Sequence, residues 1–214
     1  MNSACETQIA SWQFVSYKKY MKKKNVEIGK DVIIGHNVKI EDNVKILGEC
    51  LIGDDVTITS GSRLSDVVVG QGVYVDNSII EKSNIDKYCV IGPFSHIHPN
   101  CRVLDNVKIG AFVELKNAVV GDCSKIPHLA YIADVEIGND CNIGCGVVFA
   151  NYNCDCRQMS KIGNGVFVGC NVNIVAPVNI ADNTYICAGT TVTKDTEVGD
   201  FVIGRVRQEN KHRE

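Results

Sequence analysis

A six-residue spacing of aliphatic side chains runs through most of the chain and limits what it can fold into. An Ile or Leu recurs at every sixth position from Ile28 to Leu64, and an Ile or Val does so from Ile162 to Val198. Steps of five residues occur around Ile80. Six is not a helical period but is three times the two-residue alternation of a strand, so these anchors point to one side. The pattern predicts short strands at fixed intervals.

Glycine often follows the anchor, as at Gly29 and Gly53, and supplies tight turns between the strands. This pattern resembles the hexapeptide repeat of left-handed parallel β-helix proteins, in which three hexads complete a coil of about 18 residues. We therefore expect an all-β fold: a left-handed parallel β-helix, or hexapeptide-repeat solenoid, of about ten coils over residues 26–204.

The two ends of the chain depart from the repeat. Residues 1–25 contain aromatic and lysine residues without Gly or Pro, which favours a short N-terminal helical arm. An arm that packs on the main domain or on a neighbouring subunit is favoured over a membrane-surface helix, because its apolar face is modest. Residues 205–214 are polar and are expected to form a C-terminal tail.

Composition excludes several classes of function. With 214 residues, 45% of them apolar, and a net charge of -3, the chain can build a large core and lacks the bulk charge of a nucleic-acid or membrane-surface binder. It has no apolar run that could span a bilayer and no secretory signal, so we expect a cytoplasmic protein. Its 11 cysteines favour reduced thiols, because disulfide scaffolds are small and Cys154 and Cys156 have no second pair for zinc.

Within residues 112–152 the repeat carries several polar side chains between its anchors. The anchor pattern then breaks between Phe149 and Ile162. The break predicts a loop extruded from a corner of the prism. His128 is the leading catalytic candidate, because an imidazole can accept a proton from an amine near neutral pH. Glu114 could orient this imidazole. Phosphate and hydroxyl partners are offered nearby by Lys116, Tyr131, Asn142 and Arg157.

Four motifs follow one another in order: HLAY from His128, NIG-CG from Asn142, NY at Asn151 and APV from Ala176. Together they resemble the acetyltransferase domain of the bacterial bifunctional GlmU family, glucosamine-1-phosphate acetyltransferase / N-acetylglucosamine-1-phosphate uridyltransferase. The resemblance covers about residues 26–208. It implies a cytoplasmic homotrimer, with sites shared between subunits, in the synthesis of UDP-GlcNAc and peptidoglycan precursors.

The resemblance also implies a role for each matching residue. His128 would be the general base, with Glu114 beside it. The amino-sugar phosphate would contact His98, Lys116, Tyr131, Asn142, Asn151 and Arg157. Acetyl-CoA, the co-substrate, would contact Cys145, Asn151, Tyr152, Cys170, Ala188 and Arg205. The resemblance implies no metal for acetyl transfer.

Three positions depart from the family pattern. His98 stands where the family has an arginine before proline, and imidazole offers a phosphate fewer donors than guanidinium. Arg157 replaces the family's loop lysine and keeps its charge, and Asn153-Cys154 replaces an Asp-Gly turn. No Gly-rich nucleotidyltransferase segment precedes Val26, so we expect any uridyl transfer to come from a separate protein.

The sequence thus favours an acetyl-CoA-dependent N-acetyltransferase acting on glucosamine-1-phosphate or a related amino-sugar phosphate. One alternative is a catalytically lapsed homologue that serves as a trimeric binding or scaffold protein, as the change at His98 allows. Another is a metal enzyme resembling γ-type carbonic anhydrases. His96 and His98 alternate on one strand and point the same way, but the sequence shows no third ligand.

Overall fold

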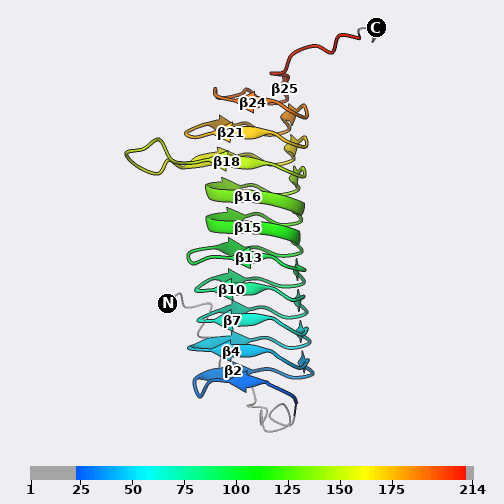
Figure 1. Ribbon diagram of the computed structural model, residues 1–214, viewed down its shortest axis with the longest axis vertical. Helices are drawn as coiled ribbons and strands as arrows, with labels where there is room; N and C mark the ends of the chain where they lie inside the picture. Colours follow the sequence, from blue (N-terminus) through cyan, green and yellow to red (C-terminus); the bar gives the residue numbers. More distant parts are fainter. Residues whose placement is uncertain (1–22, 211–214) are drawn as a thin grey trace, which may run out of the picture.

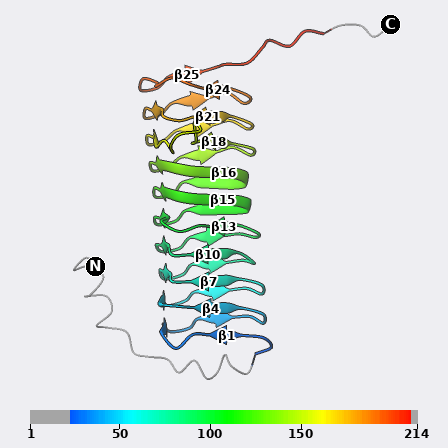
Figure 2. The same ribbon diagram turned by 60° about the vertical axis from the view of Figure 1, so that its left-hand side comes forward.

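The chain winds into one stack of short parallel strands, in which strands pair with those one coil before and one coil after them. In the computed structural model, which describes residues 23–210, all 25 strands belong to a single sheet. Figure 1 shows the coils following one another along the long axis, and Figure 2 shows the same stack from a second side. The all-β parallel solenoid of about ten coils that the hexad spacing predicts is confirmed.

The strands fall into three columns, and each column forms one face of a prism. The β1 face contains β1 (Glu27–Ile28), β4 (Lys45–Leu47), β7 (Arg63–Ser65), β10 (Ile79–Glu81), β13 (His96–Ile97), β18 (Val148–Ala150), β21 (Asn173–Val175) and β24 (Thr191–Val192). The β2 face contains β2 (Val32–Ile34), β5 (Cys50–Ile52), β8 (Val68–Val69), β11 (Asn84–Ile85), β14 (Arg102–Val103), β19 (Ser160–Ile162) and β22 (Asn179–Ile180).

The third column is the β3 face. It contains β3 (Lys39–Ile40), β6 (Thr57–Ile58), β9 (Tyr74–Val75), β12 (Val90–Ile91), β17 (Asn142–Ile143), β20 (Phe167–Val168), β23 (Tyr185–Ile186) and β25 (Phe201–Val202). Two longer strands, β15 (Lys108–Val120) and β16 (Lys125–Ile137), continue around the corners and contribute to all three faces.

The register between coils varies at the corners while the faces stay aligned. Glu27 pairs with Lys45, 18 positions along the chain, whereas Arg63 pairs with Ile79, only 16 positions along. Val135 pairs with Ser160, 25 positions along, because residues 151–159 leave the prism between β18 and β19. This loop projects from the stack beside β18 in Figure 1, as the missing anchor predicts.

The interior of the prism is a column of aliphatic side chains from successive coils. Anchors from every part of the stack are almost completely buried, for example Ile46, Ile80, Ile109, Ile143 and Ile174. Such burial stabilises each side chain by about 1.5–3 kcal/mol relative to an exposed one, so the column is the main source of stability.

The prediction that Val198 is an inward-facing anchor is wrong. Its side chain is 72% exposed, and Val202 in β25 packs against the core in its place. The last coil is shortened, since Ile186 pairs with Val202 after 16 positions. A turn in which the Glu197 N–H donates to the Asp200 carboxylate at 2.8 Å carries Val198 outward.

The predicted N-terminal arm, residues 1–25, lies outside the described residues except for the turn at 23–25. After β25, residues 203–210 form no strand and are exposed. No helix in the part of the chain that the structure describes is long and apolar enough to cross a bilayer.

Five cysteines of the described chain are buried, and none of the described cysteines forms a disulfide. Cys89, Cys101 and Cys141 lie in the core, where burial raises the pKa of each thiol. The pKa of Cys89 rises to about 12 because its thiol is desolvated and the Asp105 and Asp86 carboxylates lie nearby. These residues therefore act as small apolar core side chains, as their position four residues after an anchor indicates.

Replacing Ile109 by Ala should lower the free energy of unfolding by about 2–5 kcal/mol, because it removes a fully buried side chain and leaves a cavity. The matched control is Lys108→Ala, one residue earlier in β15, where the side chain is exposed. We expect this control to change stability by less than about 0.5 kcal/mol. Urea unfolding followed by circular dichroism measures both. Equal effects would contradict the assigned inward-facing column.

Alkylation of the native protein at pH 9 should separate buried from exposed cysteines. An ordinary thiol is half ionised there, whereas the Cys89 thiol stays protonated and buried, so only global unfolding should expose it. Iodoacetamide labelling read by peptide mass spectrometry should modify the exposed Cys154 and Cys156 rapidly and Cys89 slowly. In denaturant all three should react at similar rates. Rapid native labelling of Cys89 would contradict its burial.

Candidate functional site

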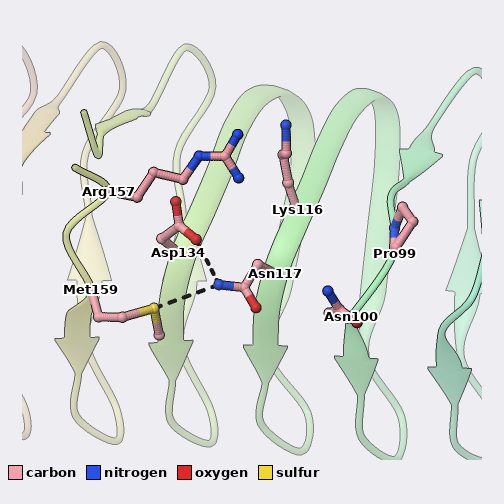
Figure 3. Close-up of a pocket in the computed structure, with 7 residues that line it drawn as sticks. All are labelled: Pro99, Asn100, Lys116, Asn117, Asp134, Arg157 and Met159. Carbon is pink, nitrogen blue, oxygen red and sulfur yellow. Dashed lines mark hydrogen bonds between the residues drawn. The ribbon is translucent and has the colours of Figure 1, made fainter. Parts of the chain in front are cut away.

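A pocket of about 460 Å³ opens where the β1 face meets the β2 face, beneath the projecting loop. Lys116 and Arg157 line it together with Asn117, Asp134 and Met159 (Figure 3). Figure 3 shows the Arg157 guanidinium reaching from the loop toward Lys116, with Asp134 just below Arg157 in this view. Two cations and one carboxylate give the pocket a net positive charge, which suits an anionic group such as a phosphate.

Asp134 joins the pocket to the base of the loop. Its side chain is buried and accepts a hydrogen bond from Asn117 Nδ2 at 2.6 Å. It also accepts one from Asn151 Nδ2, at the point where the chain leaves β18. The loop is closed further by the antiparallel bridge between Tyr152 and Arg157 and by the Gln158 N–H, which donates to the Asn151 carbonyl at 2.8 Å. These contacts hold Arg157 over the pocket.

A second group of predicted residues lies at the other end of the β1 face, on the corner between the β3 and β1 faces. Cys145, Cys170 and Ala188 follow one another on this corner: the Asn171 N–H donates to the Cys145 carbonyl, and the Gly189 N–H donates to the Cys170 carbonyl. Arg205 lies beside this row, since its Cδ is 3.7 Å from where a Cβ on Gly189 would stand.

His128 belongs to the same corner row, one coil before Cys145. The flanking pairs Lys125 with Asn142 and Tyr131 with Val148 are both 17 positions apart, which places His128 next to Cys145 along the stack. Neighbouring coils are about 4.8 Å apart. The His128 side chain is exposed.

Gly110 makes this corner possible. A Cβ on Gly110 would come within 1.8 Å of the Pro127 carbonyl oxygen, so no side chain fits there. The Gly110 backbone therefore approaches the residue that precedes His128 more closely than any other amino acid would allow.

The β1 face between the two corners carries Glu114 and Tyr131, which are in register with each other. A shallow hollow of about 330 Å³ on this face is lined by both, together with Phe112 and Leu129 from the His128 corner. The Glu114 carboxylate is 2.7 Å from Nε2 of His98. Its contact is therefore with His98, whereas His128 is in register with Ala111.

The predicted residues thus fall into separate groups within one chain. Lys116, Arg157 and Asn151 gather around the loop corner, whereas His128, Cys145, Cys170, Ala188 and Arg205 follow the opposite corner. Tyr131, Glu114 and His98 lie on the β1 face or at its edge. Asn142 lies on the β3 face and is in register with Phe167. The exposed Tyr152 donates its hydroxyl hydrogen to the Cys154 carbonyl.

Asp134, at the base of the loop, and Glu81, beside His96 and His98, are among the residues that sequence reasoning missed. Asp134 is flanked by anchors and resembles any turn residue, although a left-handed φ of 50° marks its corner. Glu81 reaches the histidine pair from the preceding coil, because Ile80 is in register with Ile97. Only the 17-residue step of this coil, which includes five-residue intervals, brings Glu81 beside His98.

The fold and the stacked corner rows define a hexapeptide-repeat solenoid with candidate ligand sites on two corners. The chain belongs to the family described as bacterial transferase hexapeptide (six repeats), whose pattern matches residues 31–66, 82–117 and 159–194. The parallel β-solenoid is consistent with the left-handed β-helix fold that the repeat predicts.

Curated relatives agree with the resemblance read from the motifs. The chain is 43% identical over 187 residues to the bifunctional protein GlmU of Clostridium botulinum (strain 657 / Type Ba4), covering 87% of this chain and 40% of that protein. It is 44% identical over 164 residues to the bifunctional protein GlmU of Listeria monocytogenes serotype 4a (strain HCC23), covering 77% of this chain and 36% of that protein. The chain therefore corresponds to less than half the length of these relatives.

Among solved structures, the UDP-N-acetylglucosamine acyltransferase from Campylobacter jejuni is similar in fold. The TM-score is 0.53 at 18% sequence identity, over 73% of this chain and 68% of that chain. At this identity the likeness concerns the fold alone.

Replacing Asp134 by Ala should loosen the loop over residues 151–159. The change removes an acceptor from Asn117 and from the buried Asn151, and leaving the buried Asn151 donor unpaired costs about 1–3 kcal/mol. Hydrogen exchange measured by mass spectrometry should become faster in peptides that contain the Gln158 amide. Asp155→Ala, at an exposed loop carboxylate, is the control and should leave this exchange unchanged. Unchanged protection in Asp134→Ala would mean that other contacts hold the loop.

Proposed function

We propose that the chain transfers an acetyl group from acetyl-CoA to the amine of an amino-sugar phosphate, with glucosamine-1-phosphate as the favoured acceptor. The observation that carries this proposal is the corner row that joins His128 to Cys145, Cys170 and Ala188. This row places a proton acceptor, His128, next to an extended strip of backbone. The GlmU relatives support the same chemistry.

The corner row suits acetyl-CoA in two respects. Successive coils present backbone groups about 4.8 Å apart, a regular strip along which an extended pantetheine arm can lie. Arg205, beside Gly189, supplies a positive charge toward the far end for the phosphates of the nucleotide part. Among the described residues, the Cys145 N–H has no hydrogen-bond partner, so it is available to the carbonyl oxygen of a thioester.

The reaction needs no covalent enzyme intermediate. The amine nitrogen attacks the acetyl carbonyl carbon, and His128 accepts the proton that the amine loses. The tetrahedral intermediate carries its negative charge on oxygen, where the Cys145 N–H can donate a hydrogen bond. The carbon–sulfur bond then breaks and CoA leaves as a thiolate, which His128 reprotonates. The imidazole thus returns to its starting state after each turnover.

The acceptor phosphate is assigned to the pocket of Lys116 and Arg157, because two cations there face a single carboxylate. Within one chain this pocket and His128 lie on opposite corners of the prism, so a small sugar cannot contact both. A homotrimer resolves this separation if the pocket of one subunit faces the corner row of its neighbour. Phe94, Phe112 and Leu129 form an exposed apolar row on the His128 corner, and Phe94 stacks on Phe112 at 5.5 Å. Such a row suits a subunit interface.

The test is release of CoA from acetyl-CoA in the presence of a panel of amino sugars with and without a phosphate. We expect turnover with glucosamine-1-phosphate and much less with glucosamine, because the cationic pocket would lose its ligand. His128→Ala should lower kcat by about 10²–10⁴-fold, the usual contribution of a general base. His36→Ala is the matched control, since His36 is an exposed histidine near the start of the prism.

Equal turnover by the wild type and His128→Ala would remove His128 from the mechanism. Acetyl-CoA binding without turnover on any amino sugar would instead favour the lapsed, non-catalytic alternative. Sedimentation velocity on the same samples determines whether the active species is a trimer.

A further inference from the structure

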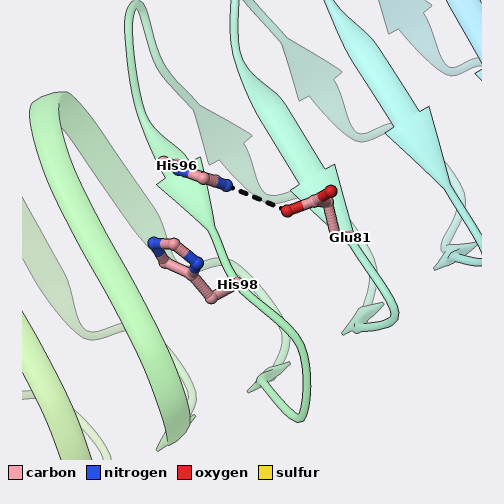
Figure 4. Close-up of side chains that lie close together, drawn as sticks. All are labelled: Glu81, His96 and His98. Carbon is pink, nitrogen blue, oxygen red and sulfur yellow. Dashed lines mark hydrogen bonds and ion pairs between the residues drawn. The ribbon is translucent and has the colours of Figure 1, made fainter.

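Three side chains with metal-binding groups converge on the β1 face below the candidate site. Glu81, His96 and His98 each offer one ligand atom, and these three atoms all lie within 4.8 Å of one another (Figure 4). Glu81 comes from β10, whereas His96 belongs to β13 and His98 follows that strand. All three side chains are partly exposed.

The repeat itself brings these residues together. His96 and His98 are two positions apart, so they point to the same side of their strand, outward from the buried Ile97. Ile79 pairs with His96 and Ile80 with Ile97, which places Glu81 beside His98 on the neighbouring coil. Because the backbone is held by the coil-to-coil pairing, the three groups are positioned by a rigid support.

Glu114 fixes the orientation of one imidazole. Its carboxylate is 2.7 Å from Nε2 of His98 and accepts a hydrogen from that nitrogen. The Nδ1 of His98 is then the nitrogen with a lone pair, and in Figure 4 it lies on the side of the ring nearer Glu81. A histidine that donates one ring N–H to a carboxylate and offers its other nitrogen is the usual arrangement of a metal ligand.

The distances suit one ion between the ligands. Nε2 of His96 is 3.1 Å from Oε2 of Glu81. Two atoms that bind the same tetrahedral ion at roughly 2.0–2.1 Å are themselves about 3.3 Å apart. The His96 and His98 rings are stacked, with centroids 3.7 Å apart and planes inclined by 28°. With His98 held by Glu114, rotation of the His96 imidazole about its side-chain bonds brings its lone pair toward the same point.

We propose that Glu81, His96 and His98 form a binding site for a divalent transition-metal ion of the Zn²⁺ or Fe²⁺ class, with Glu114 as the residue that positions His98. Two imidazoles and one carboxylate are the donors that these ions prefer, whereas Mg²⁺ and Ca²⁺ prefer oxygen ligands. All three ligands come from one chain. The His98 side chain is 22% exposed and those of His96 and Glu81 are 37% and 42% exposed, so positions on the ion stay open to water or an anionic ligand. The proposal does not rest on acetyl transfer.

The test is titration of the full, metal-stripped chain with Co²⁺, followed by visible absorption, and with Zn²⁺, followed by calorimetry. We expect one ion per chain and a Co²⁺ spectrum of nitrogen and oxygen ligands. Glu81→Gln and His96→Asn should each weaken binding by more than about 100-fold, because each removes a direct ligand. Glu114→Gln should weaken it by about 10–100-fold, the usual effect of losing an outer partner.

Two controls make the result decisive. His36→Asn removes a histidine whose Nδ1 is 3.4 Å from Asp54, an exposed pair that has no third ligand among the described residues, and should leave affinity unchanged. A Cys154→Ser, Cys156→Ser variant removes the exposed thiols of the loop and should also bind normally. Stoichiometric binding that survives Glu81→Gln and His96→Asn, intense sulfur-to-Co²⁺ absorption, or the absence of one-to-one binding would each overturn the proposal. Circular dichroism of every variant confirms that the solenoid is intact.

Discussion

Coil-to-coil pairing is the constraint on which every other feature depends. A strand of two or three residues has too few hydrogen bonds and too little buried surface to be stable alone. Here most strands pair on both sides, and the aliphatic side chain behind each pair stacks on the one from the next coil. Backbone pairing and core packing thus fix the same register, so a side chain's place on the surface follows from its position within the coil.

This register explains why functional groups form rows. Cys145, Cys170 and Ala188 occupy one corner of successive coils, and Asn117, Asp134 and Asn151 follow the opposite corner and are joined by hydrogen bonds. Residues far apart in the chain become neighbours with little loop structure between them. The one sizeable excursion within residues 23–210 is the loop 151–159, which is held at its base by Asp134 and brings Arg157 over a pocket that the prism alone would leave open.

The sequence was sufficient to predict the fold because a buried aliphatic residue at every sixth position leaves few alternatives. It also predicted the loop, since residues 151–159 lack an anchor. It failed at Val198, where hydrogen bonding of Glu197 and Asp200 shortens the last coil and outweighs the spacing. Contacts between coils were harder to foresee. Glu81 contacts His96, and Asp134 contacts Asn151, only at particular coil lengths, and the length of each corner is decided by local turn geometry.

The unequal coil lengths have a further consequence for how such a molecule can change. Steps of 16, 18 and 25 residues coexist in one stack while the strands remain aligned. Insertions and deletions at a corner are therefore absorbed locally, because the faces on either side recover their pairing within a few residues. A corner can gain a segment, as at residues 151–159, without disturbing the coils above and below. Changes in the length or sequence of a corner can therefore alter the surface while the core stays intact. Corners are the places where inserted segments should be accepted.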